Sequence, residues 1–355
     1  MADDSRLAAY VREVYDDFKQ QRQDLEGIWD LSYDAFMGRY SESNLTKWKA
    51  LEGHDWRSKV FIRFARRKII SAVAQINDIQ FQGGVLPFNI AATEVPEDLQ
   101  GQVLPFEIAT DRARKMKTLI SDMLEGQKYD RTLMSSNLEL GIYGMSVHKA
   151  PVIRSKQSIN YRLWIPPAAQ MMDKIFRTQV AMKYSRMQRQ ENSVMLPFVE
   201  HVNLWDYFWD MEAKDHQSGV GNIHRVMMSP GMLRRLEELP GYDKSAINKV
   251  LSGWNESEGG GSAPDEGPGA ERLKRRRRNL EVVEFWGLCP KKHLKGNDRV
   301  LSQATTDGRE TEICTTIVYS GGNRTDGVVI KQAEANPLPL SRRPFNVAYW
   351  ESIPH

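Results

Sequence analysis

The sequence predicts an α+β fold, with a mainly α-helical first part and a β-rich last part. Through about the first 140 residues, apolar side chains recur at three- and four-residue steps, which is the pattern of amphipathic helices. From about residue 280, short runs of β-branched and aromatic residues alternate with turn signals, which is the pattern of strands. A chain of 355 residues can bury one large core or two modest ones.

Four helices are expected before residue 145. Two of them have a basic edge, at 63–68 and at 112–117, and these cations are expected to face solvent or another subunit. A glycine-containing run at 141–144 should end the fourth helix, and alternating residues then predict a strand at 145–152. The four helices are expected around residues 7–18, 56–76, 108–126 and 129–141.

The middle of the chain should mix strands and short helices. β-like runs are expected between 159 and 210, and they end in the aromatic-rich corner Trp205–Asp210. Ser229 and Pro230 form a helix start, with the serine as N-cap, and this helix should stop before the next proline. A further short helix is expected from Asp243.

Residues 255–278 form an insertion of unusual composition. The stretch 255–270 contains five glycines, two prolines and four carboxylates, so it cannot bury enough surface to offset its ordering entropy, and a mobile loop is expected. A basic tract follows the acidic stretch, so the local charge changes from negative to positive. The tract consists of Lys274, Arg275, Arg276, Arg277 and Arg278. In one interpretation the tract binds phosphate or an acidic partner surface, and in the other it is a solvated flank of the loop.

The last part is the clearest β region. A proline-rich extended segment at 336–345 should follow its strands. An aromatic-rich run begins just before the last residue, so the natural protein is expected to continue past His355. Strands are expected at 282–286, 315–319 and 328–330, with a hairpin turn at 320–323.

Composition narrows the class of protein. The 49 basic and 46 acidic side chains leave a formal charge of +3, so charge alone does not indicate a nucleic-acid-coating protein. Two cysteines cannot form a disulfide framework or a four-ligand zinc site, which favours a reducing compartment. The sequence shows no signal peptide and no apolar run of about 18 residues, so a soluble, intracellularly made protein is expected.

No pattern of a catalytic site stands out. The chain has neither a G-x-x-x-x-G-K-[ST] nucleotide loop nor a G-x-S-x-G elbow. Asp206, Asp210, Asp215 and His216 are the best metal-ligand candidates, and a polar loop beside an aromatic core is the favoured interpretation of them. Cys289 is interpreted as a small apolar strand residue rather than an activated thiol. The prediction is a non-enzymatic protein with no catalytic residue, metal or cofactor.

Three stretches, taken in order, point to one family. The corner at 203–210 leads through a strand at 222–226 into the Ser229-capped helix. The run Leu280–Gly287 is similar to the first strand of a separate β-rich region. Residues 336–355 are similar to an extended segment that leads out of that β-rich region. Together they resemble the portal proteins of tailed bacteriophages, in particular those of the short-tailed (podovirus) type.

The resemblance implies a portal-like subunit of a cyclic oligomer, a ring commonly of about twelve copies at one vertex of the capsid. The second stem helix and the channel-lining loop of the family would lie beyond this chain. In the family's terms, 1–200 looks like the α-rich wing, 201–254 holds a β corner and the first stem helix, 255–279 is a flexible acidic and basic insertion, and 280–355 is the β-rich clip with the start of a second stem segment.

The resemblance also implies the partners and the location. Double-stranded DNA would pass through the ring without sequence-specific contacts. The clip would dock the terminase large subunit and later a tail adaptor or head-completion protein, next to capsid and scaffold proteins, with no membrane involved. The ring would form in the host cytoplasm and end in the virion. Neighbouring clips are expected to pair through strand edges, with an interface at Val283, Phe285, Trp286, Ile317, Tyr319 and Val329.

Two other classes of protein are alternatives. A head-to-tail adaptor, or another virion interaction protein, would be shorter and would lack the long helical first half. A metal-dependent DNA-processing enzyme would use Asp206, Asp210 and Asp215 to bind a divalent ion, and its activity would be lost in an Asp210→Ala variant.

Overall fold

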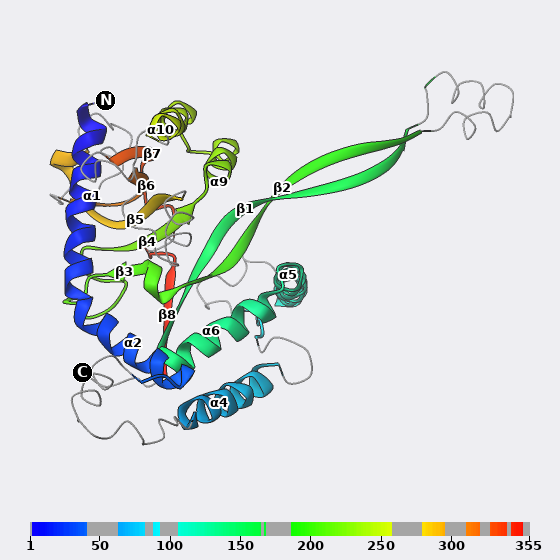
Figure 1. Cartoon of the computed structure of the whole chain (residues 1–355). Helices are drawn as coiled ribbons and strands as arrows, with labels where there is room; N and C mark the ends of the chain where they lie inside the picture. The colour runs from blue at the N-terminus through cyan, green and yellow to red at the C-terminus, as the bar shows by residue number, and fades with distance from the viewer. Residues whose placement is uncertain are drawn as a thin grey trace, which may run out of the picture. The chain divides into compact units, whose positions relative to one another are not determined.

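The computed structural model divides the chain into two compact units, residues 1–150 with 199–355, and residues 151–198. Figure 1 shows the order of the elements along the chain. The structure describes residues 2–40, 63–81, 88–92, 106–164, 167, 186–257, 279–294, 310–319, 327–338 and 342–350.

A five-stranded antiparallel sheet is the centre of the larger unit. Its strand order is β3-β4-β5-β6-β7, so each strand pairs with its neighbours in the sequence. Along β5, side chains alternate between the two faces, and both faces are buried. The strands are β3 (Tyr207–Trp209), β4 (Gly221–Met228), β5 (Leu280–Pro290), β6 (Glu310–Tyr319) and β7 (Gly327–Ala335).

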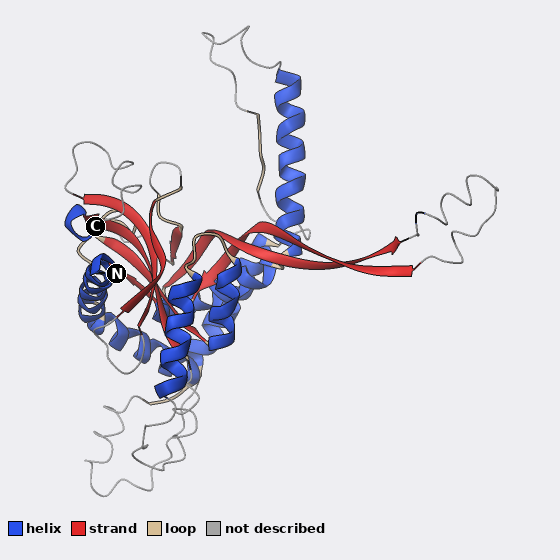
Figure 2. Ribbon diagram, turned by 90° about the horizontal axis from the view of Figure 1, so that it is seen from above, coloured by secondary structure: helices blue, strands red, loops and turns tan. Residues whose placement is uncertain are grey.

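The first helix, α1 (Ala2–Gln21), covers one face of this sheet. Figure 2 shows it beside the curved strands. The Tyr319 hydroxyl donates to the Ala8 carbonyl at 2.9 Å, and the Tyr15 hydroxyl donates to the Glu281 carboxylate at 2.9 Å. The apolar period predicted for this helix therefore faces the sheet, with Leu7, Val11, Val14, Tyr15 and Phe18 buried against residues from all five strands.

Two short helical segments cover part of the opposite face. Ser229 caps α9, accepting a hydrogen bond from the Met232 amide, and Pro230 occupies the first turn, as predicted. Leu233 and Ile247 are fully buried against the sheet, where Leu280 is one of their neighbours. The segments are α9 (Pro230–Arg235), continued by the 3₁₀ turn η4 (Leu236–Glu238), and α10 (Lys244–Ser257).

A second sheet, with strand order β2-β1-β8, joins distant parts of the chain. β8 pairs antiparallel with the start of β1, and its register runs from Met145 opposite Tyr349 to Lys149 opposite Phe345. The parts of β1 and β2 between residues 151 and 198 form the smaller unit. The strands are β1 (Met145–Trp164), β2 (Arg186–Val202) and β8 (Phe345–Tyr349).

Four further helices belong to the larger unit. α6 contacts α2, α4 and α5, and α2 also contacts α4. Gly144 ends α6 with a φ of 79°, a left-handed conformation that favours glycine, and its amide donates to the Leu140 carbonyl. The helices are α2 (Gln23–Met37), α4 (Phe64–Gln80), α5 (Phe106–Gly126) and α6 (Tyr129–Tyr143).

The structure confirms the predicted α+β fold and the predicted helices around 7–18, 108–126, 129–141 and from Asp243. One expectation needs correction: α10 continues to Ser257, so the first residues of the expected loop at 255–270 are helical. One helix, α2, was not predicted. The core under α1 contains residues from both ends of the chain. Residues 56–62, 258–278 and 320–323 lie outside the described residues.

Candidate assembly surface

The outward side of α2 exposes large apolar side chains. Ile28 is 58% exposed and Leu31 is 54% exposed, three residues apart on the helix. On another side of the same helix, Trp29 and Phe36 are buried. α2 is therefore apolar on two sides, and within the described part of this chain only one of them is covered.

α5 and α4 show the same property. From Ile108 to Gly126 only Ala113 of α5 is buried, while Met116 is 54% and Leu119 is 55% exposed. In α4, Val73 is the single buried residue, and the two ends of the helix expose Phe64 and Ile79. Each helix thus contacts its neighbours along a narrow side only.

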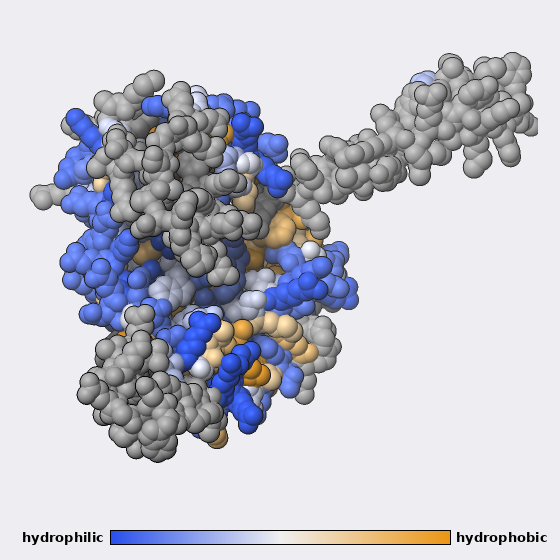
Figure 3. All heavy atoms as spheres, viewed as in Figure 1, coloured by the Kyte–Doolittle hydropathy of each residue, from blue (hydrophilic) through white to orange (hydrophobic). Residues whose placement is uncertain are grey.

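These exposed side chains constitute a candidate assembly surface. In Figure 3, hydrophobic residues lie beside hydrophilic ones over α4 and α6. Covering a side chain of this size fully contributes roughly 1.5–3 kcal/mol, so helices that each expose several such side chains are candidates for protein–protein contacts. We define the assembly surface as the outward sides of three helices, which contribute Ile28 and Leu31 (α2), Phe64, Ile70 and Ile79 (α4), and Ile108, Met116 and Leu119 (α5).

A buried arginine sets the direction of α2. Arg22, at the junction of α1 and α2, is 3% exposed. Its guanidinium donates to the backbone carbonyls of Leu204 and Trp205, each at 3.2 Å, and to that of Tyr207. The Glu26 carboxylate, one helical turn later, also accepts from it. The helix carrying the exposed Ile28 is thereby fixed to the aromatic corner before β3.

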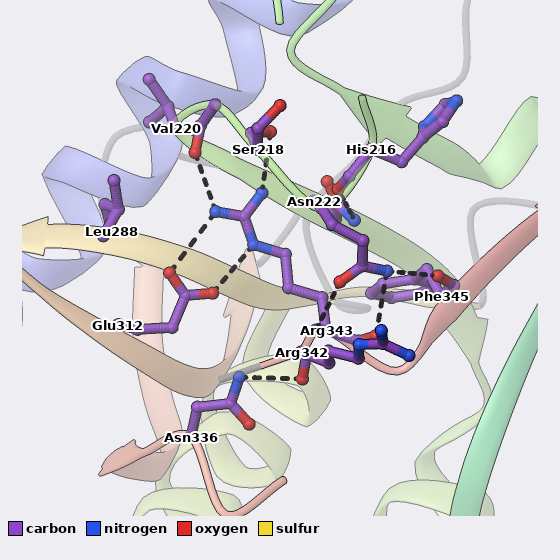
Figure 4. A network of polar contacts seen from close by, with 12 residues as sticks. His216, Ser218, Val220, Asn222, Leu288, Glu312, Asn336, Arg342, Arg343 and Phe345 are labelled. Atoms are coloured by element: carbon purple, nitrogen blue, oxygen red, sulfur yellow. Dashed lines mark hydrogen bonds and ion pairs between the residues drawn. The ribbon is translucent and has the colours of Figure 1, made fainter. Parts of the chain in front are cut away.

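A second buried arginine fixes the segment before β8 (Figure 4). The Nε of Arg343 donates to the Glu312 carboxylate of β6 at 2.8 Å. Its Nη2 donates to the Gly219 carbonyl at 2.8 Å, and its Nη1 donates to the Ser218 carbonyl at 3.3 Å. The side-chain amide of Gln217 donates to the carbonyls of Arg343 and Phe345. These bonds join the exit segment to β6 and to the loop before β4.

A third polar cluster lies between the two sheets. The Lys149 ammonium of β1 donates to the Glu284 carboxylate of β5, and the Trp286 indole donates to the same carboxylate at 2.7 Å. Desolvation alone would raise the pKa of Glu284, but Lys149 and these hydrogen bonds outweigh it and lower the pKa to about 2. His224 is buried beside the pair, and its burial, reinforced by the Lys149 charge, lowers its pKa to about 4.

The residues predicted as metal-ligand candidates do not converge on one point. Asp206 forms an ion pair with Arg225 at 2.8 Å, while Asp210 accepts from the backbone amides of Glu212 and Val220. Asp215 likewise accepts from a backbone amide of its own loop. Within the described ranges, no three His, Cys, Asp or Glu side chains are grouped so that they could hold a metal ion.

His216, the fourth of these candidates, bridges two tyrosine hydroxyls. Its Nδ1 lies 3.2 Å from the Tyr207 hydroxyl, and its Nε2 forms a hydrogen bond with the Tyr349 hydroxyl. Burial lowers the pKa of His216 to about 4. Cys289 is also buried in the sheet, which raises its pKa to about 12, as expected for a small apolar strand residue rather than an activated thiol.

The six residues predicted as an interface between clips are all buried inside the chain itself. They pack against α1 or between the two sheets, so a contact with a second copy would have to use strand edges or other side chains. One sheet edge, β3, has three residues, and the outer edge of β7 is occupied where the Asp243 amide donates to the Ile330 carbonyl at 2.8 Å. The six are Val283, Phe285, Trp286, Ile317, Tyr319 and Val329.

The predicted charged features have different outcomes. The basic tract, from Lys274 to Arg278, lies outside the described residues. On α5, Arg112, Arg114 and Lys115 are exposed, in agreement with a face directed to solvent or to another subunit. The apolar side chains of α2 were missed, because they lie on two sides of the helix and form no single stripe in the sequence.

Comparison with known proteins does not place the chain in a family: no protein-family model matches it, and no curated protein matches it. Among the described helices, none combines the length and the apolar character that crossing a membrane requires.

Proposed function

We propose that this chain is one subunit of a ring of identical copies, of the portal type found at a capsid vertex of short-tailed phages. The observation that supports this proposal is the assembly surface, on which three helices expose large apolar side chains without a covering element in the described chain. A second copy is the simplest partner, because most soluble oligomers are assembled from identical subunits with closed symmetry.

Two distinct patches are needed for a ring. A head-to-tail interface uses different surfaces on the two subunits and closes into a ring when the rotation between them allows it. α2 and α5 both contact α6, and no packing of α2 on α5 is among the main helix contacts of the described chain. Their exposed sides therefore can serve as the two different patches that such an interface requires.

In this proposal the helical first part is wing-like, the short helix after Ser229 begins the stem, and the β-rich last part belongs to the clip. The order of helices, aromatic corner, capped helix and sheet supports this division. Double-stranded DNA would pass through the channel, and a chain with a formal charge of only +3 suits a channel that touches phosphates loosely and reads no bases.

The remaining partners follow from the same proposal. The clip region would dock the terminase large subunit during DNA packaging and a tail adaptor afterwards, and the ring would sit among capsid and scaffold proteins of the virion. The ring does no catalysis in this account, and it needs no cofactor.

Negative-stain electron microscopy of the purified protein tests the proposal. Class averages with rotational symmetry, about a dozen subunits and a central hole are the expected result. Particles of the size of a single chain at every concentration tested would overturn it.

A further inference from the structure

The charges on α2 and on the first turns of α5 are opposite. Between Gln23 and Met37, α2 contains four carboxylates and no lysine or arginine. From Phe106 to Leu119, α5 contains four cations and two carboxylates, Glu107 and Asp111, and Asp111 already forms ion pairs with Arg114 and Lys115. The two helices that expose apolar side chains are thus complementary in charge.

Charge and apolar character occur on the same side of each helix. On α5, Ile108, Arg112, Met116 and Leu119 follow one another at steps of three or four residues, and all are exposed. On α2, Asp24, Ile28 and Leu31 do the same. Each side can therefore present apolar contacts flanked by charge, which is the usual composition of a helix–helix interface.

Gly27 gives α2 a place for close approach. It lies in the middle of the helix on the exposed side, and a Cβ built on it would meet no atom within 4 Å. A glycine inside a helix costs about 1 kcal/mol relative to alanine, and nothing in the packing of the described chain compensates this cost. A second helix that packs over Gly27 could come nearer to the α2 backbone than any other residue would allow.

We infer that the exposed side of α2 in one copy binds the exposed side of the α5 segment from Ile108 to Leu119 in the next copy. The contact is limited to this segment because Asp122 and Glu125, later in α5, would repel the α2 carboxylates. The inference rests on the proposed ring and specifies its head-to-tail interface: α2 is one patch, and α5 is the other.

Site-specific cross-linking tests the pairing directly. One protein carries Ile28→Cys and a second carries Met116→Cys, and both positions are more than half exposed, so the fold is preserved. The two natural cysteines are buried and do not interfere. Rings assembled by producing the two variants together and treated with a short bis-maleimide should give a two-chain product, whereas each variant alone should give none.

A matched control replaces an exposed residue of α10. A mixture of Lys249→Cys with Met116→Cys should give no two-chain product under the same conditions. The double variant, Ile28→Cys with Met116→Cys in one chain, should give a ladder of products that ends at the number of subunits in the ring.

Charge reversal supplies an independent readout. Asp24→Lys with Asp34→Lys should abolish the cross-link, as should Arg112→Glu with Lys115→Glu. Combining all four changes in one chain should restore it, because the complementarity is re-established with opposite signs. The exposed pair Lys244→Glu with Lys249→Glu changes the net charge equally on α10 and should have no effect.

The outcomes separate the inference from the proposed function. Rings in the microscope without a cross-link between α2 and α5 would overturn the inference and leave the ring standing. A cross-link without rings would support the contact and overturn the ring. Absence of both would overturn both.

Discussion

Arg343 and Glu312 form an ion pair, with 2.8 Å between Nε and Oε1, that joins the exit segment before β8 to β6 of the central sheet. The arginine side chain is 2% exposed and also donates to the carbonyls of Ser218 and Gly219. One side chain thereby fixes three segments that are distant in the sequence. Without it, a carboxylate and two backbone carbonyls would lose a buried donor.

Arg343→Met should lower the free energy of unfolding by about 3 kcal/mol, because it leaves the partly buried Glu312 without its cation. The matched control is Arg342→Met, since Arg342 is the adjacent residue and its side chain is exposed. Urea unfolding followed by circular dichroism measures both. Equal stability of the two variants would show that the ion pair contributes nothing to the fold.

Arg22→Lys should lower the free energy of unfolding by about 2 kcal/mol although it keeps the charge. A lysine ammonium cannot reach the carbonyls of Leu204, Trp205 and Tyr207 and the Glu26 carboxylate from one position, as the planar guanidinium does. Arg114→Lys, at an exposed position of α5, is the control and should be neutral. Equal midpoint temperatures of the two variants in thermal unfolding would contradict the role of Arg22.

Two buried histidines should make the protein sensitive to mild acid. The pKa values of His216 and His224 are lowered to about 4 from 6.5, so the unfolded chain takes up protons that the folded chain does not. Their contribution is complete above pH 6.5 and is lost as the pH falls towards 4. Glu284, with a pKa lowered to about 2, adds a further loss below about pH 4.5.

His224→Asn tests this pH dependence. Between pH 7 and pH 4.5 the wild type should lose roughly 2 kcal/mol more stability than this variant, since one pKa unit corresponds to about 1.4 kcal/mol. Thr316→Ser, a buried change in the same sheet, is the control because it removes no titrating group. Parallel stability curves for wild type and His224→Asn across this range would refute the expectation.

Gly27→Ala should separate stability from assembly. The added methyl group meets nothing in the described chain, so the helix gains up to about 1 kcal/mol of stability. The same methyl group lies where the neighbouring α5 should approach, so self-association measured by sedimentation velocity should weaken. Gly253→Ala on α10, also with open space around it, should stabilise the chain without changing association. Equal effects of the two changes on association would argue against the α2 contact.

Helices that are defined by neighbouring residues alone could be predicted from the sequence. The steps from Leu7 to Phe18 define α1, and Ser229 with Pro230 defines the start of α9, because periodicity and caps depend on neighbouring residues alone. α2 was missed: its apolar residues lie on two sides and Gly27 interrupts them, so no single stripe appears in the sequence.

Neither the pairing of distant strands nor the burial of charged side chains could be predicted from the sequence. The strand beginning at Met145 pairs with β8 about 200 residues later, and local patterns contain no information on that register. Arg22 and Arg343 look like surface cations until their carbonyl partners are known. The alternation of residues along the strand indicated that Val283 and Phe285 are covered. It did not indicate that α1 of the same chain covers them.

Native mass spectrometry of the wild-type protein is the most direct test of the central proposal, self-assembly into a closed ring. We expect one dominant species at about twelve times the mass of the chain, and we expect it to dissociate when Ile28 and Leu119 are both replaced by lysine. A single-chain mass for the wild type at micromolar concentration and low salt would contradict it.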